Sequence, residues 1–335
     1  MLATVFHVKH IWTILHGGAL GDLALTLRLA RGLPGVEPAG RLRVVSRTTL
    51  AALRDGRPAL DCRSSETAGL TWLYGDGQAP PPVPLRKLIS GQRVLNALDA
   101  PDSPLHRRLL QLAPRALYSF DPRPQPACAA HIVTQWRRTL AAQGLDVPAD
   151  EPPYSAALRV SPRCVARGRA QLIAALDAHR GAGKRRLESV VLMHPGSGGV
   201  AKCWPLEAFV IVARQLADSG KAVAWLLGPA ELERWPAQRV ASLRAEFAVL
   251  APPSAGDLLD VLAAAGLLIA NDSGPAHLAA LIGTPTVAIF GPTSPDIWRP
   301  LGPGARVIRG DPNRAATWGI EPAAVAAAAA QIVTA

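Results

Sequence analysis

Short apolar runs alternate with longer amphipathic segments through the second half of the chain. Four apolar runs of strand length predict strands, at Ser189–Met193, Ala222–Leu227, Leu267–Ala270 and Thr286–Phe290. Segments with helical spacing lie between or around them, at 162–179, 206–219, 257–265 and 323–333. Strands that alternate with helices indicate a parallel α/β sheet, which binds its ligands at the carboxyl ends of its strands.

The first half repeats this pattern less clearly. It opens with the predicted strand Ile11–Leu15, a glycine loop and the helix Leu23–Leu33. A second strand at Leu42–Val45 and a helix at His131–Gln143 follow, whereas Pro80–Pro84 and Asp121–Pro126 predict loops or rigid spacers and Asp146–Pro153 predicts a linker or domain edge. Because both halves have the α/β pattern, we expect two such domains facing each other across a cleft.

Length and charge narrow the class of partner. The 335 residues suggest about two domains, and 49% hydrophobic residues are enough for large cores. The net charge is +11, and residues 1–160 hold 19 Lys and Arg against 12 Asp and Glu. A positive surface attracts anionic partners: acidic saccharides, phosphates, lipid headgroups or nucleic acid. The charges are spread out with no basic run of five, and a solvated arginine-rich surface explains any single arginine equally well.

The cysteines and the N-terminus predict a cytoplasmic protein. The four cysteines are too far apart in sequence for a CxxC motif, which indicates reduced thiols without a metal. Val8-Lys9-His10 interrupts the N-terminal apolar residues, so no signal peptide is expected. No window approaches 18 apolar residues, so we expect no transmembrane helix and at most peripheral membrane contact.

The first glycine loop, "GGALGDLALTL" from Gly17 to Leu27, follows a predicted strand and precedes a helix. It matches only half of a dinucleotide-binding fingerprint, because the third position of that fingerprint holds no glycine in this chain. Asp22 stands at the junction of loop and helix. It is either an ordinary helix cap or a general base that deprotonates a hydroxyl brought into the cleft.

The second glycine loop, "HPGSGGVAKCWP" from His194 to Pro205, also follows a strand. Its backbone N–H groups can form an anion nest, contributed by Gly196, Ser197, Gly198 and Gly199. Lys202 follows at a distance suited to a phosphate charge, although the loop lacks the Gly-Lys-Ser/Thr of a Walker A motif. His194 is either a structural strand-end histidine or part of the site.

Two further stretches carry acidic or polar groups just after a strand. In "LLGPAELE", Glu231 is placed either to bind a ribose diol or to lie solvated at a helix start. In "NDSGPAHLAALIGTPTVAIFG", four polar or small residues mark a helix start: Asp272, Ser273, Gly274 and His277. They predict either a helix cap or an anion site at the helix N-terminus.

The order of these motifs resembles the bacterial ADP-heptose:lipopolysaccharide heptosyltransferases, glycosyltransferase family 9. The order is a glycine loop with Asp, Gly-Ser-Gly-Gly-x-x-Lys-x-Trp-Pro, Gly-Pro-x-Glu, Asp-Ser-Gly-x-x-His-Leu-Ala and Phe-Gly-Pro-Thr-x-Pro. The resemblance is dense from His194 to Pro295 and covers Ile14 to Leu33 in the first half. Residues 55–160 show little of it, and the role of this proline-rich region is not predicted.

The resemblance implies a GT-B fold with two Rossmann-like domains, residues 1–158 binding the acceptor and 159–335 the nucleotide-sugar donor. It implies inverting transfer of heptose from ADP-heptose, without a metal or other cofactor, to an anionic saccharide or glycolipid such as the lipopolysaccharide inner core. It implies no nucleic-acid partner. Asp22 is then the general base, and Gly18 and Gly21 are candidates for acceptor contacts. The donor-binding residues it implies are Ser197, Gly198, Lys202, Glu231, Asp272, Ser273, Gly274 and His277. It also implies a monomer in the cytoplasm or at the inner face of the membrane.

Three alternatives remain open at this level. The first is a GT-B nucleotide-sugar epimerase, which predicts several catalytic acids around the donor carbon. The second is a family member with another donor and acceptor, or one that binds without transferring. It is favoured by three departures from the family pattern, at Arg28, Gly198 and Ser294. The third is an NAD-binding α/β protein, which the incomplete fingerprint at Gly17–Leu27 disfavours.

Overall fold

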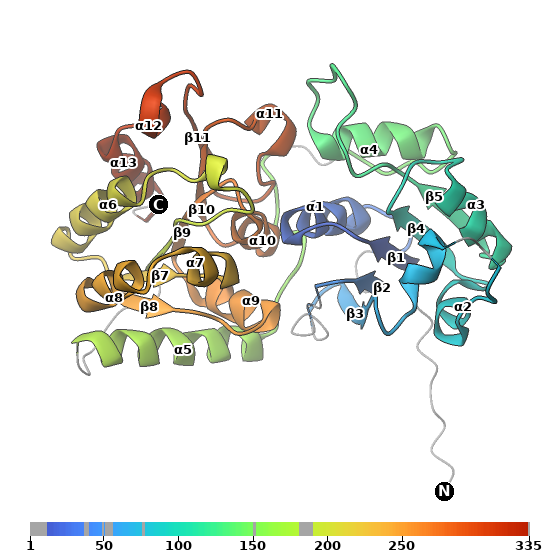
Figure 1. Cartoon of the computed structure of the whole chain (residues 1–335), viewed down its shortest axis with the longest axis horizontal. Helices are drawn as coiled ribbons and strands as arrows, with labels where there is room; N and C mark the ends of the chain where they lie inside the picture. Colours follow the sequence, from blue (N-terminus) through green and yellow to red (C-terminus); the bar gives the residue numbers. More distant parts are fainter. Residues whose placement is uncertain are drawn as a thin grey trace, which may run out of the picture.

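The computed structural model contains two parallel sheets, each in its own domain (Figure 1). It describes residues 12–36, 40–48, 50, 56–75, 78–149, 152–180 and 190–333. The predictions for residues 1–11 and for the turn at 181–189 lie outside this part of the chain. The described part contains no helix long and apolar enough to cross a bilayer.

The first domain holds a five-stranded sheet in the order β3-β2-β1-β4-β5. Its strands are β1 (Trp12–His16), β2 (Arg41–Ser46), β3 (Ala59–Ser64), β4 (Arg93–Ala97) and β5 (Ala116–Ser119). Its helices are α1 (Leu20–Arg31), the 3-10 helix η2 (Leu70–Tyr74), α2 (Val83–Ile89), α3 (Pro104–Gln111) and α4 (Ile132–Ala141). The strand order reverses between β1 and β4, where open α/β sheets bind ligands.

The second domain holds a six-stranded sheet in the order β11-β10-β9-β6-β7-β8, which reverses between β6 and β9. Its strands are β6 (Val191–His194), β7 (Val223–Leu226), β8 (Ala248–Leu250), β9 (Leu267–Asn271), β10 (Thr286–Phe290) and β11 (Ala305–Arg309). Its helices are α5 (Pro162–Arg180), the 3-10 helix η4 (Val200–Lys202), α6 (Leu206–Asp218), α7 (Pro229–Arg234), α8 (Ala237–Glu246), α9 (Ala255–Ala264), α10 (Gly274–Ile282), α11 (Pro295–Trp298), α12 (Ala315–Trp318) and α13 (Pro322–Val333).

Both faces of the first sheet are covered by apolar side chains. Successive strand residues point to opposite faces, so Ile14 packs with the α1 residues Leu23 and Leu27. Its neighbour Leu15 packs with Leu85 and other residues of η2, α2 and α3 on the opposite face. This layering explains why β1 is buried along its whole length and reads as a continuous apolar run.

The domains meet where the first turns of α1 and α10 pack together, at the centre of Figure 1. The approach is close because a Cβ on Gly21 would lie 3.1 Å from His277 Cδ2, and one on Gly274 would lie 2.9 Å from Leu20 Cβ. The close approach places Asp22, in the first turn of α1, on the same side of the domain contact as the N-terminus of α10.

The connecting segment is bonded to both domains. The Ala157 N–H donates to the Leu281 carbonyl of α10 (2.9 Å), and the Arg31 Nη1 of α1 donates to the Ala156 carbonyl (3.2 Å). Beyond it, α5 packs against α9 of the second domain. The predicted division between residues 158 and 159 falls in this segment and stays a prediction.

The main elements confirm the predicted pattern, with differences at their ends and in the middle. Helix α1 begins at Leu20 rather than Leu23, which places Asp22 in its first turn. The loop prediction for Pro80–Pro84 is wrong at its end, because Val83 and Pro84 form the first turn of α2, where proline is tolerated. Strands β3, β4, β5, β8 and β11 were not predicted. Strand β8 has three residues, and β3, β5 and β11 are only partly buried, whereas β4 has four buried residues but only a short apolar run, Val94-Leu95, in its sequence.

Candidate active site

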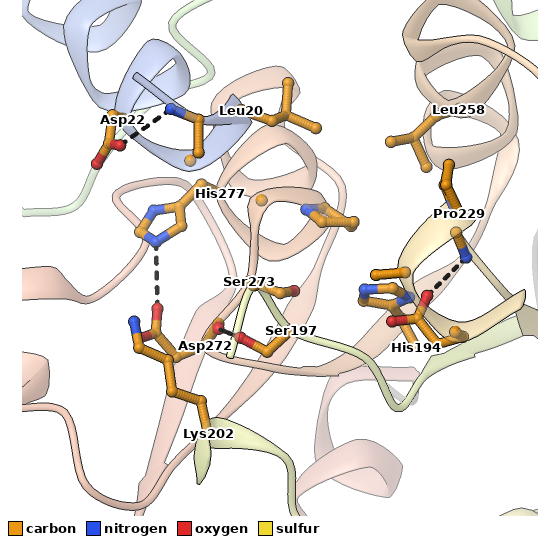
Figure 2. A pocket seen from close by; sticks show the side chains of 18 of the residues that line it. Leu20, Asp22, His194, Ser197, Lys202, Pro229, Leu258, Asp272, Ser273 and His277 are labelled. Carbon is orange, nitrogen blue, oxygen red and sulfur yellow. Dashed lines mark hydrogen bonds and ion pairs between the residues drawn. The ribbon is translucent and has the colours of Figure 1, made fainter. Parts of the chain in front are cut away.

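A cavity of about 460 Å³ lies between the two domains, and most of the residues singled out in the sequence line it. Figure 2 shows their side chains converging from α1 above and from the loops after β6, β7 and β9 below. The lining includes Gly21, Asp22, His194, Ser197, Gly198, Lys202, Glu231, Asp272, Ser273, Gly274 and His277. Gly18 is not in the lining, but a Cβ there would lie 2.8 Å from Asp22 Oδ2, so a side chain would crowd that carboxylate.

The loop after β6 is braced against the end of β9, at the point where the strand order of the second sheet reverses. Asn271 is buried; its Nδ2 donates to the Pro195 carbonyl (2.6 Å) and its Oδ1 accepts from the Trp204 N–H (3.0 Å). Ser197 Oγ donates to the Asp272 carbonyl (2.6 Å). These three bonds fix both ends of the glycine loop. Asn271 precedes the polar motif directly, but sequence reasoning did not single it out.

Asp272 is the centre of a buried charge network. Its Oδ2 accepts from Lys202 Nζ (3.0 Å) and Thr293 Oγ1 (2.8 Å), while Oδ1 lies 3.5 Å from His277 Nε2. Burial alone raises the pKa of Asp272, but the hydrogen bond from His277 and the charges of His277 and Lys202 outweigh it and lower the pKa to about 2. The carboxylate is therefore ionised and holds Lys202 and His277 at the cavity wall.

The cap interpretation of the Asp272–His277 turn does not account for its side chains. Ser273 is the N-cap residue of α10, yet its hydroxyl makes no capping bond. Ser273 Oγ and His277 Nδ1 are buried without a hydrogen-bond partner within the described residues. Buried polar atoms are normally bonded. Together with the helix N-terminus, these two atoms provide polar groups beside the cavity that have no bond within the described residues, which favours a ligand site over a simple helix cap.

Glu231 lies in the first turn of α7 and is buried, so the interpretation as a solvated helix-start residue is wrong. Its Oε2 accepts from the Gly228 N–H (2.7 Å). A Cβ on Gly196 would fall inside the Glu231 carboxylate. Gly196 is thus the residue that makes room for Glu231, a pairing that the sequence did not reveal because the two positions lie on separate loops.

His194 ends β6 and also lines the cavity. Its Nδ1 donates to the Leu226 carbonyl (2.9 Å), which satisfies one ring nitrogen as the structural interpretation predicts. Burial lowers the pKa of His194, partly offset by the negative charge of Glu231 and by the Leu226 bond. The imidazole is therefore neutral at neutral pH and adds no charge to the pocket.

Asp22 faces the cavity from the opposite domain. Its Oδ2 accepts from the Ala19 N–H (3.2 Å), which is the bond expected of an acid in the first helical turn. Burial raises the pKa of Asp22, and the Asp272 charge adds to this; the Ala19 bond and the charges of His277 and Lys202 oppose it. A raised pKa makes a carboxylate a stronger base, so Asp22 is suited to accept a proton.

No group of three or more His, Cys, Asp and Glu side chains that could hold a metal ion occurs within the described part of the chain. The positive groups at the cavity are instead Lys202 and the N-terminus of α10. These are the groups available here to interact with a phosphate.

Two parallel α/β domains with their ligand edges facing one cavity define the GT-B class of glycosyltransferase folds. Solved structures with this fold cover nearly the whole chain. One is a family 9 glycosyltransferase from Veillonella parvula DSM 2008 (TM-score 0.69, 18% identity, 96% of this chain and 97% of that one). Another is the E. coli heptosyltransferase WaaC with ADP (TM-score 0.63, 19% identity, 96% and 99%).

The chain belongs to glycosyltransferase family 9 (heptosyltransferase), whose family model matches residues 113–322. This match extends into the middle region, where the sequence motifs were sparse. The lipopolysaccharide heptosyltransferase 2 of Escherichia coli K12 is 39% identical over 116 residues, 33% of each chain. The lipopolysaccharide heptosyltransferase 1 of Pseudomonas aeruginosa is 33% identical over 176 residues, 52% of this chain and 44% of its own length. The chain thus aligns with less than half the length of these relatives.

Proposed function

We propose that this protein is an inverting, metal-independent glycosyltransferase that transfers heptose from ADP-heptose to a hydroxyl of a lipopolysaccharide-type acceptor. The observation that carries the proposal is the shared cavity. One domain contributes a single carboxylate with a raised pKa, and the other contributes a lysine, a helix N-terminus and a buried glutamate. The family membership and the names of the relatives supply the donor and acceptor classes.

In the proposed reaction, Asp22 accepts the proton of the acceptor hydroxyl. The acceptor oxygen then forms a bond to the anomeric carbon of the donor, while the bond from that carbon to the diphosphate oxygen breaks. The electron pair leaves with the nucleoside diphosphate, whose charge is stabilised by Lys202 and by the N-terminus of α10. Attack from the face opposite the leaving group inverts the anomeric centre.

The remaining lining residues are assigned to donor binding. Glu231 would accept hydrogen bonds from the ribose hydroxyls. Ser273 Oγ and His277 Nδ1, which have no protein partner within the described residues, would bond to the diphosphate or the sugar. Ser197, Gly198 and Gly274 would shape the backbone around the phosphates, and Gly18 would leave space for the acceptor beside Asp22. Gly21 faces His277, so its lack of a side chain serves the close approach of the two domains.

The epimerase alternative is less well supported by the cavity. It requires several acids around the donor carbon, whereas three carboxylates line the cavity within the described part of the chain: Asp22, Glu231 and Asp272. Asp272 is held by Lys202 and Thr293 and has a pKa of about 2, which makes it a poor base. Glu231 bonds to Gly228. Burial raises the pKa of Asp22, which leaves this carboxylate as the candidate base.

The proposal includes a monomer located in the cytoplasm, with peripheral contact to the inner face of the membrane. The net charge of +11 and the excess of basic residues in the first half support contact with an anionic glycolipid or lipid surface.

Titration with nucleoside diphosphates tests the donor assignment. We expect calorimetry to show binding of ADP in preference to UDP, GDP and dTDP, with an affinity that Mg²⁺ does not change, because Lys202 and the helix N-terminus supply the positive charge. Preference for another nucleotide would reassign the donor. A strict requirement for Mg²⁺ would contradict the metal-independent mechanism.

Replacing Lys202 with alanine is expected to raise the Kd for ADP about tenfold, as expected for loss of a charge-assisted hydrogen bond. It should also shift the pH dependence of transfer. The charge of Lys202 lowers the pKa of Asp22, so its removal raises that pKa further. Since transfer requires ionised Asp22, the loss of kcat on acidification should begin at a higher pH.

The pH profile of kcat measures this shift, and Lys221→Ala is the matched control. Lys221 belongs to the same domain but lies outside the cavity between the domains. An acid limb that stays in place or moves to lower pH in Lys202→Ala would contradict the proposed coupling between Lys202 and Asp22.

A further inference from the structure

We propose that Tyr74 is the residue that binds the acceptor's reacting sugar, by stacking its ring against the apolar face of that sugar beside Asp22. The inference rests on the proposed function. It assigns an acceptor-binding residue in the first domain, for which the resemblance to family 9 suggested only Gly18 and Gly21. It uses three observations: the position of Tyr74 at the ligand edge of the first sheet, the exposure of its ring, and the way its helix is anchored.

The position of Tyr74 follows from the topology of the first sheet. The strand order reverses between β1 and β4, and the loops that follow these strands begin with Gly17 and Leu98. A Cβ on Gly17 would lie 3.1 Å from Leu98 Cδ2 and 4.0 Å from the Tyr74 hydroxyl. Tyr74 therefore lies at the point where an open α/β sheet binds a ligand, beside the loop that leads to Asp22.

The ring is presented to solvent although the residues before it are buried. Leu70 and Leu73 of η2 pack into the core, whereas Tyr74 is 67% exposed. Within the described residues, the other large exposed hydrophobic side chains are aliphatic. An exposed aromatic ring beside a ligand site has no role in the core, and its apolar face suits a partner that is itself partly apolar.

Arg108 of α3 fixes the end of η2 that carries Tyr74. Its Nη1 donates to the carbonyls of Trp72 (3.0 Å) and Leu73 (3.3 Å), and its guanidinium lies 5.7 Å from the centre of the Trp72 ring. A cation that bonds the last carbonyls of a helix stabilises that end. The backbone that carries Tyr74 is thus held in place before the acceptor arrives, which lowers the entropy lost on binding.

A carboxylate at this edge of the sheet selects the part of the acceptor that binds there. Asp99 follows Leu98 in the loop after β4, so it belongs to the same edge. Burial raises the pKa of Tyr74, and the negative charge of Asp99 adds to the shift. A carboxylate accepts hydrogen bonds from hydroxyls and repels anions. The sugar on Tyr74 therefore presents hydroxyls to Asp99 and a CH face to the ring, while the acceptor's own carboxylates and phosphates point away.

The test compares Tyr74→Ala and Tyr74→Phe with the wild type, and uses Leu110→Ala as the matched control. Leu110 is an exposed apolar residue on α3 of the same domain. The probe is the deacylated oligosaccharide of heptose-free lipopolysaccharide, used in transfer kinetics with ADP-heptose and in direct binding titrations with ADP present. We expect Tyr74→Ala to raise both the acceptor KM and the acceptor Kd about tenfold with an unchanged Kd for ADP. Tyr74→Phe and Leu110→Ala should stay within about threefold of the wild type.

The outcomes separate this inference from the proposed function. If the wild type binds the oligosaccharide in a Tyr74-dependent way but transfers no heptose, the inference stands and the proposed function fails. If the wild type does not bind the oligosaccharide, or Tyr74→Ala binds it as well as the wild type, the inference is overturned. An equal loss in Leu110→Ala would also overturn it, because the effect would then be a general one on the domain.

Discussion

Replacing Asp22 with asparagine is expected to reduce the rate of sugar transfer about 10³-fold. Asparagine has nearly the same shape but cannot accept the proton of the acceptor hydroxyl. The donor pocket should be unchanged, because its side chains belong to the other domain and bond to one another, as in the contact between Lys202 and Asp272. Steady-state transfer assays and calorimetry with ADP measure the two quantities separately.

Thermal unfolding is the control for this variant. Burial raises the pKa of Asp22 in the folded protein, so its ionised form at neutral pH opposes folding, and stability gained from this group appears as the pH falls. Asparagine removes the charge and can still accept the hydrogen bond from Ala19. The melting temperature should therefore stay the same or rise. The matched variant Asp296→Asn, at an exposed carboxylate of α11, should transfer at the wild-type rate.

Two results would count against the assignment of Asp22. Transfer by Asp22→Asn at the wild-type rate would show that another group, or water, takes the proton. A fall in ADP affinity equal to the fall in rate would show that Asp22 acts through the shape of the cleft, as the N3 residue of α1, rather than as a base.

Replacing Gly196 with alanine is expected to weaken ADP binding between tenfold and about 100-fold. The added methyl group would occupy the position of the Glu231 carboxylate, so Glu231 must rotate away from the cavity. Two consequences follow. The ribose loses an acceptor of charge-assisted hydrogen bonds, each of which contributes about 1.5–3 kcal/mol, and the Gly228 N–H loses its bond to Glu231. Calorimetry with ADP measures the loss.

Gly199→Ala is the matched control, because it adds the same methyl group to the same loop. A Cβ at Gly199 would meet no atom within 4 Å, and its backbone φ of −131° is accessible to alanine. It should bind ADP within about twofold of the wild type. If Gly196→Ala binds ADP normally, Glu231 does not hold the nucleotide. A Glu231→Gln variant distinguishes that result from a rearranged loop, since it keeps the size of the side chain and removes the charge.

The chemical groups of the donor site could be found from the sequence because each follows a recognisable local pattern. His194, Asp272 and Glu231 come within a few residues of the ends of apolar runs that predict strands, and the carboxyl ends of parallel strands meet at one edge of a sheet. The structure places all of them at one cavity. Their roles in donor binding stay predictions until the variants described above are measured.

The packing around these groups could not be predicted. In the sequence, Gly196 could not be distinguished from the other small residues of its loop, such as Gly199. Only the structure shows that Glu231 occupies the space beside Gly196 and that the space beside Gly199 is open. Asn271 had no pattern of its own, although it braces both ends of that loop. In the first domain, β4 and β5 contain only short apolar runs flanked by polar residues, so their local signals are weak and the sequence did not show where this sheet reverses or what lies there.

The sequence by itself determined the alternation of strands and helices, the two-domain α/β architecture and the residue types at the strand ends, because hydrophobic periodicity and helix-start patterns are local along the chain. Only the tertiary structure decided which of these residues meet. Ser197 and Asp272 are 75 positions apart and share a hydrogen bond, and Asp22 owes its raised pKa to burial between two domains. Such contacts and their electrostatics depend on how distant segments pack, and no single stretch of sequence contains both partners.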